Sequence, residues 1–153
     1  WWTTVTSMKR FLQEKEIENI DFLYNNSFLI EDKIITGTRG WALLESENSN
    51  KMIQREAARL ELSMKESIQK YGPEKERIVI MHYPPVTKAT IKNGIIFHPE
   101  FLNIMKAYGV KKCYYGHLHG KSHQDAVEGN VEGIELKLIS GDYLDFKLYP
   151  INE

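Results

Sequence analysis

The chain has 153 residues, and its 20 Lys and Arg nearly balance its 21 Asp and Glu. That length suits a single domain over residues 1–153, and a hydrophobic content of 42% is enough to build a core. The balanced charge disfavours extended nucleic acid as a partner, because binding a polyanion needs an excess of basic residues. Apolar runs of four or five residues are too short to cross a membrane. A single cysteine permits no internal disulfide, so we expect a cytoplasmic location.

In the first half of the chain, short elements precede one long helix. Residues 50–71 carry apolar side chains every three or four positions, which predicts a helix. Gly72 and Pro73 end that helix in the usual order. The elements predicted before it are, in chain order, a helix within residues 3–17, strands over 21–24, 28–30 and 34–36, and a glycine-bracketed loop over 37–41.

The second half reads as buried strands alternating with loops. Residues 77–81 form a continuous β-branched run, which is typical of a strand buried on both faces. Alternating apolar residues predict that 134–139 and 143–149 pair as an antiparallel hairpin. Between these lie, in order, a loop over 86–97, a short helix opened by His98 and Pro99 and closed by Gly109, and a strand over 110–115.

Three of the five histidines directly follow predicted buried strands. His82 follows the first strand, and His117 and His119 follow the second within a Gly-His-Leu-His-Gly sequence. Strand ends hold ligands rigidly, and neutral imidazole binds Zn, Fe, Mn and similar ions. We therefore predict that His82, His117 and His119 are metal ligands. His98, at a helix start, is interpreted as structural, and His123, in a polar loop, is assigned no role.

Several other residues leave two interpretations open. Arg39 lies in a loop at a strand end, where it either contacts a substrate phosphate or is an ordinary surface arginine. Tyr83, beside His82, either shapes a pocket or has no such role. The remaining assignments are a core position for Trp41, a buried and unreactive Cys113, and solvated loop positions for Lys88, Lys92 and Asn93.

Two segments resemble a known family. Ile78–Pro85, which reads Ile-Val-Ile-Met-His-Tyr-Pro-Pro, and Tyr114–Gly120, which reads Tyr-Tyr-Gly-His-Leu-His-Gly, resemble the last two signature blocks of the calcineurin-like metallophosphoesterases. The resemblance implies an α/β fold, part of a two-sheet αββα sandwich with mixed strands and flanking helices. It also implies two divalent metal ions (Mn, Fe, Zn or Ni) at the strand ends and a phosphate ester as substrate.

The resemblance assigns His82 and His117 to the second metal and His119 to the first. Members of the family also have Asp-x-His, Gly-Asp-x-x-Asp and Gly-Asn-His-Asp motifs, which supply the remaining ligands and a catalytic histidine. We recognise none of the three in this chain, so it contributes no catalytic residue. The chain begins with Trp1, not Met. The resemblance therefore implies a C-terminal fragment of a phosphoesterase whose N-terminal portion is missing.

Three neutral imidazoles split between two metal positions hold ions poorly without a bridging carboxylate. We expect the isolated chain to hold at most one ion weakly and to be nearly inactive. The complete enzyme would use a dinuclear metal-bridged hydroxide. Apolar surface left by the missing portion would favour self-association. Two alternatives remain open: a non-catalytic module that binds a single metal through three histidines, and a metallohydrolase acting on amides or carboxylic esters.

Overall fold

The structure, a computed structural model, describes residues 4–41 and 49–151. It is a mixed α/β fold with a six-stranded sheet in the order β1-β2-β3-β6-β8-β7 and a separate two-stranded sheet, β4-β5. None of the helices in these two ranges is both long and apolar enough to cross a membrane. The bounds are α1 Val5–Glu14, β1 Ser27–Ile30, β2 Lys33–Thr38, α2 Ser49–Tyr71, β3 Arg77–Met81, β4 Ile91–Lys92, β5 Ile95–Ile96, α3 Glu100–Ala107, β6 Lys112–Tyr115, β7 Gly129–Val131 and β8 Ile134–Leu138, with 3-10 turns at Lys88–Thr90 and Gly120–Asp125.

The centre of the large sheet is parallel. Strands β2, β3, β6 and β8 are neighbours and all run in the same direction, whereas β1 and β7 are antiparallel at the two edges. In this register Met81, the last residue of β3, pairs with Thr38 of β2 and with Tyr115 of β6. The carboxyl ends of four adjacent strands therefore meet at one edge of the sheet.

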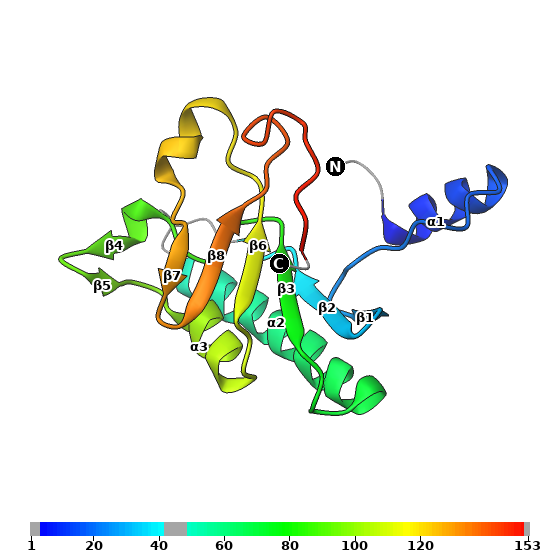
Figure 1. Cartoon of the computed structure of the whole chain (residues 1–153), viewed down its shortest axis with the longest axis horizontal. Helices are drawn as coiled ribbons and strands as arrows, with labels where there is room; N and C mark the ends of the chain where they lie inside the picture. The colour runs from blue at the N-terminus through cyan, green and yellow to red at the C-terminus, as the bar shows by residue number, and fades with distance from the viewer. Residues whose placement is uncertain (1–3, 42–48, 152–153) are drawn as a thin grey trace.

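The two helices that follow β2 and the 86–97 loop cover one face of the sheet (Figure 1). Helix α2 begins and ends within one residue of the predicted 50–71. Its apolar stripe is buried as predicted, because Leu60 and Met64 have no exposed surface. Leu102 and Met105 of α3 are equally buried in the same core, which also takes in alternate side chains of β3, β6 and β8.

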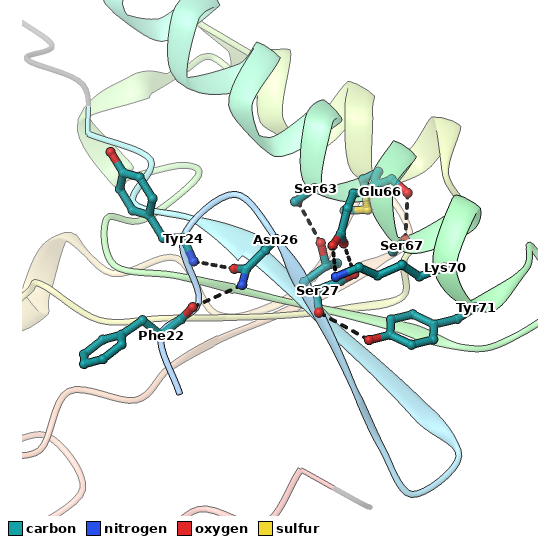
Figure 2. A network of polar contacts seen from close by, with 11 residues as sticks. Phe22, Tyr24, Asn26, Ser27, Ser63, Glu66, Ser67, Lys70 and Tyr71 are labelled. Carbon is teal, nitrogen blue, oxygen red and sulfur yellow. Dashed lines mark hydrogen bonds and ion pairs between the residues drawn. The ribbon is translucent and has the colours of Figure 1, made fainter. Parts of the chain in front are cut away.

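Polar contacts fix α2 against the edge strand β1 (Figure 2). The Ser27 hydroxyl donates to Glu66, whose carboxylate also pairs with Lys70 one turn later. The Tyr71 hydroxyl donates to the Ser27 carbonyl at 3.5 Å. These bonds join the last turns of α2 to the first residue of β1, so they fix the β1–β2 hairpin against the helix.

The start of β3 is tied to the end of α2 by a buried arginine. The Arg77 guanidinium donates to the Ser67 hydroxyl at 2.8 Å and to the carbonyls of Gly72, Pro73 and Lys75. Gly72, Pro73 and Lys75 lie in the turn between α2 and β3, so these bonds tie that turn to the first residue of β3. Burial lowers the pKa of Arg77, and its multiple hydrogen bonds compensate for the lost hydration.

The opposite face of the sheet is only partly covered. Its buried centre consists of Ile35, Ile78 and Tyr114, against which Leu23 and Ile151 pack. No helix of the described ranges lies across this centre, and α1 lies off to one side of the sheet (Figure 1). We refer to this surface as the open face.

Four predicted elements differ from the structure. Gly37 and Thr38, predicted to begin a loop over 37–41, extend strand β2. Residues 21–24 form no strand; this segment instead lays Leu23 onto the open face. Residues 143–149 form no strand either, and β8 pairs with β7, with Leu136 opposite Gly129. The reason is a folded turn after β8, in which the Phe146 N–H donates to the Gly141 carbonyl at 2.7 Å.

The loop predicted over 86–97 contains a small hairpin instead. Strands β4 and β5 pair through a two-residue turn at Asn93 and Gly94. Both residues have positive φ, 52° and 74°, as a type I′ turn requires. Asn-Gly is the strongest short-range hairpin signal, so this element was readable from the sequence.

Candidate functional site

The carboxyl edge of the parallel strands gathers most of the residues singled out in the sequence. Arg39 directly follows β2, and His82 directly follows β3. His117 lies two residues beyond the end of β6, and Asp142 lies four residues beyond the end of β8. The four residues follow four adjacent parallel strands. Because neighbouring parallel strands end at the same edge of a sheet, the four residues lie along one edge. His82 and His117 lie close together at this edge, and their role as metal ligands stays a prediction.

His82 and His117 are directly paired. The Nε2 atom of His82 lies 3.2 Å from the Nδ1 atom of His117. The Tyr83 ring packs on the His117 ring with 3.9 Å between centroids and a 37° tilt. The Gly116 N–H donates to the His82 carbonyl at 3.2 Å, which ties the two strand ends together. The Tyr83 ring therefore covers one side of the histidine pair.

The backbone at His117 is in an unusual conformation. Its φ is 70°, in the left-handed region. The Leu118 N–H donates to the Gly116 carbonyl at 2.9 Å and closes a three-residue turn centred on His117. Turns of this kind are rare and strained, and such strain clusters at functional sites. The conformation costs about 1–3 kcal/mol, which the surrounding structure must offset.

The surroundings of the pair favour neutral imidazoles. Burial lowers the pKa of His82, and the nearby charges of His117, Arg39 and His119 lower it further. Burial likewise lowers the pKa of His117, with additional effects from His119 and Arg39. A neutral imidazole offers a nitrogen lone pair to a ligand. The positive charge of Arg39 acts on both histidines, so an anion bound beside them would also lie near a cation.

Arg39 is exposed and lies over aromatic rings. Its guanidinium carbon is 5.4 Å from the centroid of the Trp41 ring and 5.8 Å from that of Tyr83. Both distances fit cation–π contacts, which orient the guanidinium without using its N–H donors. Trp41 is half-buried here, outside the two core clusters, in contrast to the core position predicted for it.

His119 makes a different contact, with a residue that the sequence analysis did not single out. Its Nδ1 atom lies 2.7 Å from Oδ1 of Asp142. The Gly120 N–H donates to Oδ2 at 2.9 Å, and Nε2 of His123 lies 3.2 Å from the same oxygen. The hydrogen bond from Gly120, followed by the contacts of His119 and His123, lowers the pKa of Asp142 well below its ordinary value, although partial burial raises it.

The sequence did contain a signal for Asp142. Gly141–Asp145 reads Gly-Asp-Tyr-Leu-Asp, which matches the Gly-Asp-x-x-Asp motif that the sequence analysis did not recognise. The statement that this motif is lacking was therefore wrong. In the family the motif precedes the histidine blocks, whereas here it follows them, so any role of Asp142 rests on its observed contacts.

The donor set fits one metal ion better than two. Nitrogens bound to one ion at about 2.1 Å lie roughly 3.0–3.4 Å apart for bond angles between 90° and 109°. The 3.2 Å between the facing nitrogens of His82 and His117 falls within that range. Within 4–41 and 49–151, no group of three or more His, Cys, Asp and Glu side chains is arranged to hold a metal. The role of His119 as a ligand stays a prediction.

A pocket of about 510 Å³ opens beside His82 on the open face. Its polar lining includes Thr38 and Arg39. Leu23, Ile80 and Ile139 supply much of its apolar lining. The pocket therefore joins an apolar wall to the imidazole and guanidinium at the sheet edge.

The other sequence candidates lie away from this pair. His98 is half-buried, with a φ of 64°, beside Phe97 and Pro84 in a small separate hollow. Cys113 is buried in the helix-side core, and burial raises its pKa strongly, so its thiol stays protonated. The loop residues predicted to be solvated, Lys88, Lys92 and Asn93, are exposed.

Comparisons of the chain with protein-family models, with curated protein sequences and with solved structures found no match. The resemblance to metallophosphoesterases therefore rests on the two histidine segments alone.

Proposed function

We propose that this chain carries part of the metal site of a phosphoesterase. The observation that carries the proposal is the pairing of His82 and His117 at adjacent strand ends, with 3.2 Å between nitrogens that can bind one ion. In the family that the two segments resemble, these positions are ligands of the second metal. The same resemblance extends the proposal to an αββα sandwich and to a second ion bound through His119.

Phosphate as the ligand chemistry is supported by Arg39. Guanidinium binds phosphate through two parallel hydrogen bonds. Arg39 is exposed, and its guanidinium lies 5.8 Å from the centroid of the Tyr83 ring, which packs on His117. The lowered pKa of both imidazoles favours the neutral form that binds a cation, so a metal ion and an anion can be held together. The apolar pocket beside His82 would accept the organic part of an ester.

A bound divalent ion would supply Lewis-acid activation of water and neutralisation of phosphoryl charge. The chain's own residues would hold it through His82 and His117, while Arg39 orients the phosphoryl group. Two imidazoles are few ligands for a divalent ion. The isolated chain is therefore expected to bind at most one ion weakly and to turn over little substrate.

Metal and phosphate titrations of the chain test the proposal. We expect equilibrium dialysis to give no more than one Zn²⁺ or Mn²⁺ per chain, and His82→Gln or His117→Gln to weaken binding strongly. His98→Asn, outside the pair, is the matched control. With Zn²⁺ present, inorganic phosphate should bind more weakly to Arg39→Gln than to Arg10→Gln, a variant of the exposed α1 arginine. Equal metal affinity in wild type and both histidine variants would contradict the proposal.

The reaction class is tested on the full-length product of the gene. With Mn²⁺, we expect hydrolysis of bis(4-nitrophenyl) phosphate and no hydrolysis of a 4-nitroanilide. Hydrolysis of the anilide alone would identify a metallohydrolase of another bond type. Binding of one metal without hydrolysis of either compound would identify a non-catalytic metal-binding module.

A further inference from the structure

The Asp142 carboxylate has both of its oxygens engaged. Oδ1 lies 2.7 Å from Nδ1 of His119, and Oδ2 accepts from the Gly120 N–H at 2.9 Å. His123 approaches Oδ2 as well, with its Nε2 atom 3.2 Å away. Contacts from three residues on one carboxylate fix its position and its orientation.

The backbone that carries Asp142 is also fixed. The N–H groups of Tyr143 and Leu144 both donate to the Ser140 carbonyl, at 3.0 and 3.1 Å. Ser140 itself is buried, and its hydroxyl has no hydrogen-bond partner among the described residues. Asp142 therefore lies in a hydrogen-bonded turn over residues 140–144, shortly after the end of β8.

His119, in contrast, is not held by packing. Its side chain is 63% exposed, so neighbouring atoms restrict its ring little. Among the described residues, the hydrogen bond at Nδ1 orients the ring. When Nδ1 of a neutral imidazole carries the proton, Nε2 keeps its lone pair, and the partner of one nitrogen decides the state of the other.

We propose that Asp142 is a positioning residue for His119, which it holds in the tautomer with a proton on Nδ1 and a free lone pair on Nε2. An ion pair with an exposed histidine contributes little to stability, so the His119 contact adds little to what the Gly120 bond already contributes to the fold. A carboxylate that accepts from one imidazole nitrogen is a recurrent partner of histidines that bind metal through the other. The metal role of Nε2 rests on the proposed function, whereas the tautomer does not.

The direct test is ¹H–¹⁵N NMR of the histidine rings in the metal-free protein at about pH 8, where ordinary histidines are neutral. We expect His119 to show a protonated Nδ1 and an unprotonated Nε2. In Asp142→Ala the proton should move to Nε2 in a large fraction of molecules. Asp145→Ala, three residues away and exposed, is the matched control and should leave His119 unchanged.

A wild-type His119 protonated at Nε2 would overturn the proposal without any variant. An unchanged tautomer in folded Asp142→Ala would overturn it as well. If Asp142→Ala does not fold, Asp142→Asn replaces it. Asparagine has one acceptor oxygen for the two donors His119 and Gly120, so part of the Nδ1-protonated population should still be lost.

Zn²⁺ affinity separates this proposal from the proposed function. Loss of a carboxylate partner of a ligating histidine typically weakens metal binding by about 10–100-fold. In the full-length product of the gene, where we propose that His119 binds the second ion, we expect a loss of that size in Asp142→Ala and none in Asp145→Ala. A changed tautomer with unchanged Zn²⁺ affinity would support the positioning role and count against His119 as a metal ligand.

Discussion

One face of the six-stranded sheet lies against α2 and α3, and its alternate side chains, Val79, Cys113 and Leu136 among them, join one continuous core. On the other face, the buried centre within the described ranges consists of Ile35, Ile78 and Tyr114, covered mainly by single side chains from loops. The same strands supply both faces, because successive residues point to opposite sides. What differs is the element that packs against each face.

The difference shows how the site residues are held. The core under α2 and α3 holds β2, β3, β6 and β8 in fixed positions from one side. The side chains that follow their carboxyl ends are therefore also held in fixed positions. The pocket beside His82 lies on the open face, where its walls come from loops as well as from strands. We expect substitutions under the helices to affect global stability, and those on the open face to act mainly near the site.

The largest expected loss of stability comes from a substitution on the open face, and it is an exception to the expectation that such substitutions act mainly near the site. A Cβ atom added to Gly37 would lie 1.8 Å from the Ile80 carbonyl oxygen. The β2–β3 pair would have to separate, so Gly37→Ala should lose more than about 4 kcal/mol of unfolding free energy. Chemical denaturation measures this loss. Gly116→Ala, whose Cβ would meet nothing nearer than 3.7 Å, should fold normally. An unchanged denaturation midpoint for Gly37→Ala would contradict the expectation.

Truncation under the helices should come next in size. Leu60 has no exposed surface and lies in the core of the helix-covered face. Leu60→Ala should lower the free energy of unfolding by about 2–5 kcal/mol, through lost burial and a residual cavity. Leu62→Ala, two residues along the same helix and 58% exposed, should change it little. Equal effects of the two variants in urea denaturation would show that the helix packs otherwise.

The matching truncation on the open face sharpens the comparison. Ile80 is half-buried and contacts the open-face cluster. Ile80→Ala should lower the free energy of unfolding by about 1 kcal/mol, since only part of the side chain is removed from water. The same urea experiment gives the value. A loss as large as that of Leu60→Ala would mean that another element covers this face in solution.

The smallest expected effect is a pH dependence at the polar margin of the open face. Burial raises the pKa of Glu128, but hydrogen bonds from Lys137, Tyr143 and the Leu138 N–H lower it below the ordinary 4.5. A lowered pKa in the folded state stabilises the fold above the unfolded pKa, and this contribution is lost as the pH falls through the folded value.

Thermal unfolding measured from about pH 6 down to pH 3 tests this sign. Glu128→Gln should be less stable than wild type at pH 6, and the difference should shrink toward pH 3. Glu135→Gln, exposed on β8, should run parallel to wild type. A gap between Glu128→Gln and wild type that stays constant with pH would contradict the assignment.

Much of the fold was predictable because its elements carry strong local signals. The stripe on α2 and the β-branched run of β3 were each recognised within one residue of their bounds. The hairpin assigned to residues 143–149 failed for a tertiary reason. An alternating pattern shows which side chains of a strand face the core, but it does not show which strand pairs with it. In the structure β7, and not residues 143–149, pairs antiparallel with β8.

The candidate site divides in the same way. The sequence by itself determined that His82, His117 and His119 follow buried strands, since glycine, proline and apolar runs mark where those strands end. Only the tertiary structure placed His82 beside His117 and His119 within hydrogen-bond distance of Asp142. The reason is that the order of the parallel strands β3, β6 and β8 determines which strand ends are neighbours. Strand ends are local properties of a chain, whereas strand order depends on contacts between residues far apart in sequence.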